Sequence, residues 1–305
     1  NTGLNRYPDP YQRQLKKEVA NLKGVRSEQL FLGNGSDEAI DLILRIFCQP
    51  GKDQILTTDP TYGMYQVSAA IQDIEVIKVP LSSNFELNGN SILEALNTNT
   101  KVIFICTPMN PSGNDLDRDE IKKILDQFEG IVVIDEAYID FTDANSFTRE
   151  LNKYPNLIVL QTFSKAWGMA ALRLVMAFAY SSIIQYFNKV IAHYNLNILA
   201  QREAINRIKE APNVSKMTAT IKAERDILMG ELKNIPFVKH IFPSAANFLL
   251  LRLDQAKAIF QYLVQKEIIV RDRTNALHCE NCLRITIGTR DENEKLIAAL
   301  KMYNP

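Results

Sequence analysis

The chain has 305 residues, of which 46% are hydrophobic and 23% charged, proportions typical of a globular protein with a large core and not of a disordered or fibrous chain. Lys and Arg together number 35, as do Asp and Glu, so the composition excludes a strongly basic surface for nucleic acids or membranes. No apolar run approaches the roughly 20 residues that cross a bilayer. We expect a cytoplasmic protein with no nucleic-acid or membrane partner.

The chain begins at Asn1, without an initiator methionine or a signal peptide. It opens directly into Leu4-Asn5-Arg6-Tyr7-Pro8, a segment that reads as the interior of a longer protein. We therefore predict that residues 1–9 are the remnant of an N-terminal arm.

Short apolar segments alternate with helical patterns, which predicts a mostly parallel sheet with helices on both faces. Apolar residues at helical spacing predict helices over Asp37–Phe47 and Asp119–Gln127. A short strand is expected at Phe31 and Leu32. The further predicted strands are Ile55–Thr57, Val76–Val79, Val102–Cys106, Ile131–Asp135, Leu157–Gln161 and Arg173–Ala179.

From Pro212 a long amphipathic helix is predicted to run to about Leu232. We expect its inner side to carry Ile221, Ile227, Leu228 and Leu232. The remaining predicted elements are a strand over Asn247–Leu253, a helix over Gln255–Lys266, strands over Ile268–Arg271 and Leu283–Ile287, and a helix from Asp291. These patterns predict a large domain over residues 10–211 and a smaller α+β domain over residues 212–305.

Four cysteines are too few for a disulfide framework in a chain of this length. Cys279 and Cys282 form one Cys-x-x-Cys pair beside His278. A zinc site needs a second pair of ligands, and Cys48 and Cys106 instead stand in apolar or strand-like segments. We expect reduced thiols and no metal.

Lys165 and Asp135 are the most informative pair of residues. Asp135 ends the apolar run Ile131–Ile134, and Lys165 follows the next predicted strand in Thr162-Phe163-Ser164-Lys165. Pyridoxal 5′-phosphate (PLP) needs an amine that forms an imine with its aldehyde and a carboxylate that keeps a proton on its ring nitrogen. Ligands of parallel sheets bind at the carboxyl ends of the strands, where both residues are expected. The pair therefore indicates a PLP enzyme.

The segment Gly33-Asn34-Gly35-Ser36-Asp37-Glu38 follows a short strand and opens a predicted helix. Glycines permit a tight backbone, and Ser36 and Asp37 expose amides at a positive helix terminus, which together make a phosphate cradle. Taken alone, the segment is more typical of a capped helix after a turn. Ser164 and Arg173 add a hydroxyl and a guanidinium for the same phosphate.

Three further residues can surround the ring of the cofactor. Asn110, in the proline-rich turn Thr107–Gly113, can offer its amide to the ring oxygen, and Tyr138 can donate to the same oxygen. Tyr62 follows a strand and can stack on a flat ring. By itself, the proline-rich segment around Asn110 indicates only a turn. Tyrosines such as Tyr138 and Tyr62 are more often residues of a core or of the rim of a cavity.

Together these segments resemble the fold-type-I PLP-dependent aminotransferases over nearly the whole chain, and among them most of all the histidinol-phosphate aminotransferases. Ala171, Val175 and His193 depart from the family pattern, but none of them removes a group that takes part in the chemistry. The segments that carry the resemblance are NRYP (5–8), GNGSDE (33–38), PTYGMY (60–65), TPMNPSG (107–113), DEAY (135–138), TFSKAWGMAALR (162–173) and CLRITIGTRDE (282–292).

The resemblance implies a role for each matching position. Lys165 resembles the Schiff-base lysine and proton shuttle, and Asp135 resembles the partner of the pyridine nitrogen. Arg284 corresponds to the arginine that holds the anionic group of the substrate, and Arg271 to its helper. The other implied roles are ring-oxygen contacts for Asn110 and Tyr138, stacking for Tyr62, phosphate binding for Ser36, Asp37, Ser164 and Arg173, and a substrate contact for Asn247.

The resemblance also implies a homodimer, in which Tyr7 reaches the cofactor phosphate and substrate of the neighbouring subunit. The reaction expected is reversible amino transfer from L-histidinol phosphate to 2-oxoglutarate in a ping-pong cycle, with imidazole-acetol phosphate and glutamate as products. Lys165 can act as a base near neutral pH only if burial beside Arg173 lowers its pKa.

Other activities of the same fold remain open. One alternative is an aromatic amino-acid aminotransferase or a threonine-phosphate decarboxylase. A more remote one is a non-enzymatic PLP-fold sensor of the kind fused to transcription regulators, although the sequence shows no DNA-binding segment or basic patch.

Overall fold

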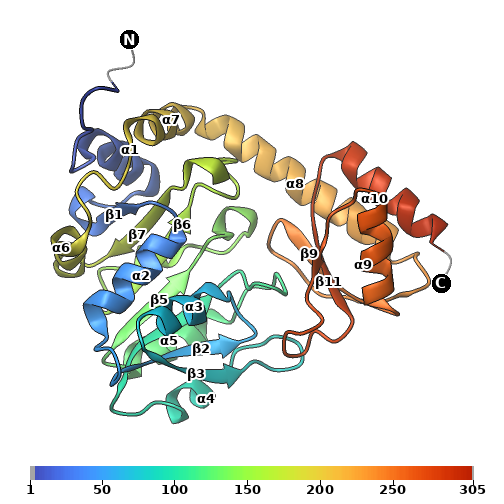
Figure 1. Ribbon diagram of the computed structural model, residues 1–305, viewed down its shortest axis with the longest axis horizontal. Helices are drawn as coiled ribbons and strands as arrows, with labels where there is room; N and C mark the ends of the chain where they lie inside the picture. Colours follow the sequence, from blue (N-terminus) through green and yellow to red (C-terminus); the bar gives the residue numbers. More distant parts are fainter. Residues whose placement is uncertain (1–3, 304–305) are drawn as a thin grey trace.

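The computed structural model describes residues 4–303, and its elements form two sheets with helices around them (Figure 1). Residues 1–3 of the predicted N-terminal remnant and residues 304–305 of the predicted small domain lie outside this range. The predicted domain boundaries themselves stay a prediction. No helix among the described residues is long and apolar enough to cross a membrane.

The large sheet has seven strands in the order β1-β7-β6-β5-β4-β2-β3. Its central strands β2 to β6 run parallel, whereas β7 is antiparallel to both β6 and β1. The predicted mostly parallel sheet is therefore confirmed. The strands are β1 (Leu30–Gly33), β2 (Gln54–Asp59), β3 (Glu75–Pro80), β4 (Thr100–Cys106), β5 (Ile131–Asp135), β6 (Leu157–Thr162) and β7 (Val175–Ala179).

Both faces of the large sheet are covered, because successive side chains of a strand point to opposite faces. In β4, Ile103 and Ile105 belong to one buried cluster, and Val102 and Phe104 to the other. The first cluster includes buried residues of α1 (Arg13–Lys23), α4 (Gly89–Glu94), α5 (Arg118–Gln127) and α7 (Ile198–Lys209). The second includes residues of α2 (Ser36–Phe47), α3 (Met64–Ile71) and α6 (Ser181–Val190).

Strands in the C-terminal third of the chain form a smaller antiparallel sheet in the order β10-β11-β9-β8. A third buried cluster joins this sheet to its helices, and α8 leads from the large sheet to the small one (Figure 1). The elements are α8 (Ala211–Leu232), β8 (Val238–Ile241), β9 (Phe248–Leu253), α9 (Ala256–Gln265), β10 (Arg271–Asp272), β11 (Cys282–Thr286) and α10 (Arg290–Met302).

Three local predictions are wrong. The strand predicted from Arg173 begins only at Val175, because Arg173 has a left-handed backbone (φ 54°) after a short 3-10 turn. The strand predicted over Ile268–Arg271 is reduced to β10, since Ile268 still bonds to the end of α9. Ile227 was expected on the inner side of α8 but is 42% exposed.

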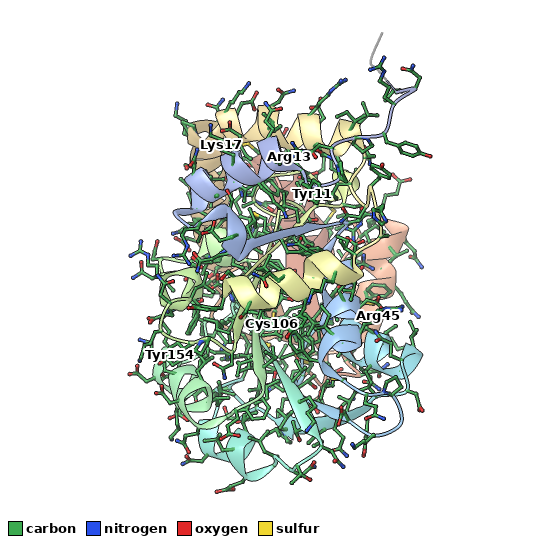
Figure 2. All side chains as sticks on the ribbon, turned by 90° about the vertical axis from the view of Figure 1, so that its left-hand side faces the viewer. Tyr11, Arg13, Lys17, Arg45, Cys106 and Tyr154 are labelled. Carbon is green, nitrogen blue, oxygen red and sulfur yellow. The ribbon has the colours of Figure 1, made fainter. Side chains whose placement is uncertain are left out.

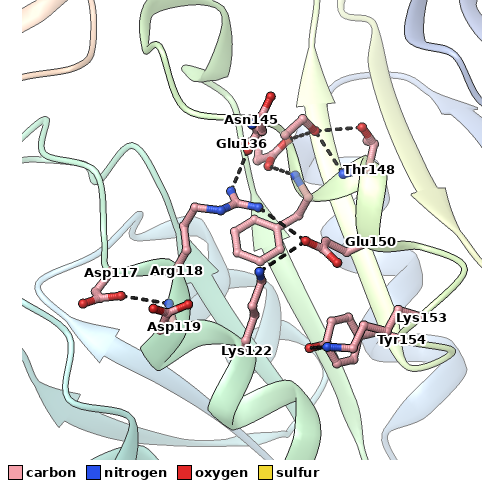
Figure 3. Close-up of polar contacts among 12 residues, drawn as sticks. Asp117, Arg118, Asp119, Lys122, Glu136, Asn145, Thr148, Glu150, Lys153 and Tyr154 are labelled. Atoms are coloured by element: carbon pink, nitrogen blue, oxygen red, sulfur yellow. Dashed lines mark hydrogen bonds and ion pairs between the residues drawn. The ribbon is translucent and has the colours of Figure 1, made fainter.

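Glu136 shows how a buried polar group is stabilised beside the sheet. Its two carboxylate oxygens accept hydrogen bonds from the Ser146 hydroxyl at 2.6 Å, the Phe147 amide at 2.7 Å and the Gln161 amide at 2.8 Å. The contacts join the end of β5 to the 3-10 turn Phe147–Glu150, on which Arg118 stacks (Figure 3). Burial raises the pKa of Glu136, against the lowering effect of these bonds.

Replacing Glu136 by alanine should lower the free energy of unfolding by about 2–4 kcal/mol, because three buried donors lose their acceptor. Glu136→Gln should lower the free energy of unfolding by less. The side-chain carbonyl of the glutamine can still accept from the Phe147 amide, and its NH2 group can donate to the Gln161 oxygen, which has no partner in the wild type. Urea denaturation of both variants tests this, with exposed Glu129→Ala as the control. Equal midpoints for Glu136→Ala and Glu129→Ala would contradict the prediction.

Candidate active site

A cavity lies where the parallel strands β4, β5 and β6 end, next to the start of α2. The carboxyl ends of parallel strands meet at one edge of a sheet, so residues far apart in the sequence converge there. Every predicted residue of the cofactor site except Tyr7 lines this cavity. The lining residues are Ser36, Asp37, Tyr62, Cys106, Asn110, Asp135, Ala137, Tyr138, Thr162, Ser164, Lys165, Ala170 and Arg173.

Asp135 is the last residue of β5, and its carboxylate is buried. One oxygen accepts from the Tyr65 hydroxyl at 2.7 Å, and the other accepts from the Ala137 amide at 3.1 Å. Burial raises the pKa of Asp135, while the two hydrogen bonds and the Lys165 ammonium counteract this effect. The structure thus holds a carboxylate at the inner end of the cavity with only 3% of its surface exposed.

Lys165 follows β6 in a turn closed by a hydrogen bond from the Gly168 amide to the Lys165 carbonyl. Solvent reaches the side chain through the cavity, and its amine lies 5.4 Å from the centre of the Tyr138 ring. Surrounding protein atoms lower the pKa of Lys165, and Arg284 and Arg173 lower it further, against the opposite effect of Asp135. The predicted lowering is confirmed, with Arg284 contributing more than Arg173.

The start of α2 and the loop before β7 form a polar end of the cavity. The helix begins after Gly35, which has no side chain to cap the first free amides. Arg173 lies 3.4 Å from the Asp37 carboxylate. Gly35 has a positive φ of 84°, a backbone conformation that residues with a Cβ rarely adopt, and the Arg173 guanidinium lies close beside it. Free amides, a guanidinium and the Ser164 hydroxyl suit a phosphate.

The middle of the cavity is lined by Tyr62, Asn110 and Tyr138. The Tyr62 hydroxyl donates to Asp37 at 3.2 Å. The Asn110 oxygen accepts from Arg284 at 2.7 Å, which orients the side-chain amide. Burial raises the pKa of Tyr138 to about 12, so its phenol keeps its proton at neutral pH and can donate a hydrogen bond.

A second cavity adjoins the first and shares four of its residues, Tyr62, Asn110, Tyr138 and Lys165. Its other wall comes from the small sheet and carries the predicted substrate residues Arg271 and Arg284. The two sheets therefore contribute opposite walls of one continuous site.

Two predicted residues are not brought to either cavity. Tyr7 is 80% exposed and stacks on Tyr194, with ring centres 4.5 Å apart, in a segment that projects from the body of the protein beyond Tyr11 (Figures 1 and 2). Asn247 precedes β9, where its carbonyl accepts from the Ile287 amide, and it is absent from both sets of described lining residues.

Sequence reasoning missed Tyr65 and Arg273. Tyr65 is fully buried on α3, stacks on Phe104 and bonds to Asp135. Its position three residues after Tyr62, on the same side of a helical turn, is the signal that could have found it. Arg273 lines the second cavity, and it stands two residues after Arg271, on the same side of a strand.

The residues that line the first cavity fit PLP, because each charged group of the cofactor meets a group of opposite charge or a hydrogen-bond partner. Phosphate donors occupy one end of the first cavity, an amine and a buried carboxylate lie within it, and an aromatic ring and two hydrogen-bonding groups line its middle. PLP requires each of these groups.

Comparisons with known proteins agree with this geometry. The family model for aminotransferase class I and II matches residues 1–300. The histidinol-phosphate aminotransferase of Cytophaga hutchinsonii is 50% identical over 98% of this chain and 86% of its own length. The crystal structure of the enzyme of that name from Clostridium acetobutylicum has a TM-score of 0.91 at 27% identity, covering 98% of this chain and 90% of that one.

The corresponding enzyme of Sinorhizobium meliloti, solved in complex with PLP, shares the fold with a TM-score of 0.88 at 22% identity, over 98% of this chain and 82% of that chain. The chain therefore belongs to the class I and II aminotransferases, whose cofactor is PLP. Within that class it is a member of the histidinol-phosphate aminotransferase family, as the sequence predicted.

Replacing Tyr65 by phenylalanine should weaken PLP binding about 5- to 30-fold, because the buried Asp135 carboxylate loses one of its two hydrogen bonds. Without this bond the pKa of Asp135 rises further, so the loss of PLP affinity should be larger near pH 6 than near pH 8. Titration of the apoenzyme with PLP, followed by absorbance, measures both effects.

Tyr262→Phe is a matched control, since it also removes a hydroxyl that donates to a protein oxygen, the Ala299 carbonyl, at a distance from the site. Equal affinities of the two variants at both pH values would show that Tyr65 does not support the Asp135 charge.

Proposed function

We propose that this chain catalyses the reversible transfer of an amino group from L-histidinol phosphate to 2-oxoglutarate, giving imidazole-acetol phosphate and glutamate in histidine biosynthesis. The observation that carries the proposal is the convergence of Lys165, Asp135 and the phosphate-binding end of α2 in one cavity, with an arginine-lined cavity beside it. Relatives named for this activity at about 50% identity support the choice of substrate.

When bound, PLP supplies an electron sink for the charge released at the α-carbon of the substrate. In this proposal Asp135 keeps the ring nitrogen protonated, which its hydrogen bonds with Tyr65 and Ala137 make possible by favouring the charged carboxylate. Lys165 would hold the cofactor through its side-chain amine. The same amine would then accept the proton from the α-carbon of the substrate and return it in the amino transfer.

The lowered pKa of Lys165 supports its role as a base, because a neutral amine is needed to accept that proton. The same lysine would serve both half-reactions of a ping-pong cycle. Asn110 and Tyr138 would contact the ring oxygen, and Tyr62 would stack on the ring. The phosphate would be held by Ser36, Asp37, Ser164 and Arg173.

Anionic groups of the substrates would bind at the second cavity. Arg284 lies between the two sheets, because its guanidinium donates to Asn110 and covers the Phe248 ring at 4.7 Å. It is therefore placed to hold an anion close to Lys165, with Arg271 as helper and Asn247 as a contact at the margin.

We also propose a homodimer in which Tyr7 reaches the site of the neighbouring subunit. The support is its distance from the cavities of its own chain and the number of exposed large hydrophobic side chains around it. Leu4, Tyr7 and Tyr11 lie on the N-terminal segment, Tyr180 just before α6, Tyr186 and Val190 on α6, Tyr194 between α6 and α7, and Leu199 on α7. The free cysteines support the proposed location in the cytoplasm.

Lys165→Ala should abolish amino transfer, because no other amine among the described residues lines the first cavity, yet PLP should still bind through its phosphate. Activity is measured with histidinol phosphate and 2-oxoglutarate, and bound PLP by its absorbance. Lys295→Ala, at an exposed position on α10, is the control. Normal turnover in Lys165→Ala would refute the assignment.

The substrate is tested on the wild-type enzyme with phenylalanine and threonine phosphate beside histidinol phosphate. A higher kcat/KM for phenylalanine would favour the aromatic aminotransferase, and release of carbon dioxide from threonine phosphate the decarboxylase. Bound PLP without turnover of any donor would favour the sensor.

Mixing Tyr7→Phe and Lys165→Ala chains tests the proposed dimer. If Tyr7 acts on the neighbouring subunit, each mixed dimer regains one complete site, and random reassortment of equal amounts gives about a quarter of the sites of the wild type. Activity is measured at limiting PLP, before and after subunit exchange. Activity that stays at the average of the two parent variants would show that Tyr7 acts within its own chain or not at all.

A further inference from the structure

Arg273 is a third arginine in the substrate cavity, and no step described so far uses it. It lines the cavity together with Arg271 and Arg284, opposite the wall that carries Lys165 and Tyr138. Four cationic side chains, Lys165 and the three arginines, line this space against a single acidic one, Asp272. Such a concentration of positive charge favours an anionic ligand.

The small sheet determines where these arginines lie. Arg271 stands directly opposite Arg284 in the antiparallel pair of β10 and β11. The Arg273 amide donates to the Cys282 carbonyl at 2.9 Å, which continues the pairing beyond the end of β10. Side chains two residues apart on a strand share a face, so Arg271 and Arg273 project toward the same side as Arg284.

The guanidinium of Arg273 lies close to the reacting end of the cavity. Burial raises the pKa of Tyr138 and lowers that of Arg284; the positive charge of Arg273 opposes the first shift and adds to the second, where it acts more strongly than the charge of Arg271. Its Nε atom is buried without a hydrogen-bond partner, and the side chain forms no ion pair with any residue between 4 and 303. The Nε atom of Arg284 is likewise unpartnered, but another nitrogen of its guanidinium donates to Asn110.

We propose that Arg273 binds the phosphate of the amino donor beside Arg284, and that it favours phosphorylated donors over those that carry a carboxylate. This inference rests on the function proposed above. A phosphate dianion presents three acceptor oxygens and can be held by two guanidinium groups at once, whereas a carboxylate presents two, which one guanidinium can satisfy. A second arginine beside Arg284 therefore adds more to phosphate binding than to carboxylate binding.

Arg273→Gln in the PLP-loaded enzyme should raise KM for histidinol phosphate about 10- to 100-fold, since a charge-assisted contact is lost. KM for glutamate in the reverse reaction should change by no more than about twofold, and kcat should fall only a few-fold. Arg273→Lys, which keeps the charge but not the planar geometry, should give an intermediate KM for histidinol phosphate. Arg26→Gln removes one exposed cation far from the cavity and serves as the matched control.

Inorganic phosphate provides a second measurement that does not depend on the donor. It should inhibit the loaded wild-type enzyme in competition with the donor, and its inhibition constant should rise about tenfold or more in Arg273→Gln. An unchanged KM for histidinol phosphate and an unchanged inhibition constant would overturn the role of Arg273 while leaving the proposed function in place. An equal rise in KM for histidinol phosphate and for glutamate would show that Arg273 does not favour phosphorylated donors.

The two proposals fail differently. If the wild-type enzyme does not accept histidinol phosphate but inhibition by phosphate still depends on Arg273, the proposed function is wrong and Arg273 serves another phosphorylated donor. If the wild-type enzyme does not turn over histidinol phosphate, and inhibition by phosphate does not depend on Arg273, both proposals are wrong.

Discussion

The burial of one carboxylate is the constraint on which the rest of the site depends. Asp135 ends a strand in the middle of the large sheet, and an isolated charge there would protonate. The Tyr65 hydroxyl, the Ala137 amide and the Lys165 ammonium counteract this tendency. A carboxylate held charged away from water can interact strongly with a protonated ring nitrogen. Burial also lowers the pKa of Lys165. The two pKa shifts have opposite signs but the same origin, because burial disfavours the charged form of either group.

The topology of the sheet supplies the geometry around this pair. Parallel strands β4, β5 and β6 end at one edge. Asp135 is the last residue of β5, and Asn110 and Lys165 lie on the segments that follow β4 and β6. The antiparallel β7 returns the chain, and the left-handed Arg173 before it turns the guanidinium toward Gly35 at the start of α2. The opposite wall of the second cavity comes from the small sheet, so the position of that sheet relative to the large one controls the width of this cavity.

Much of the fold followed from local pattern. Apolar runs such as Ile131–Asp135 fixed the central strands, and helical spacing fixed α2 and α5 to within one residue. The wrong predictions share a cause, since they concern segments whose state depends on partners distant in the sequence. Ile227 has the spacing of an inner residue, but the small sheet packs against Leu228 and Leu232 of α8 and leaves Ile227 exposed. β10 begins late because Ile268 still bonds to the end of α9, so pairing with β11 starts only at Arg271.

The sequence alone determined the cofactor and the family, because an amine, a carboxylate and a phosphate-binding turn at strand ends are defined by residue type and order along the chain. Only the tertiary structure decided that Tyr65 bonds to Asp135, that Arg284 joins the two sheets through Asn110, and that Arg273 lines the second cavity. Such contacts depend on how separate elements pack in space, and packing is a property of the whole chain that no local pattern encodes.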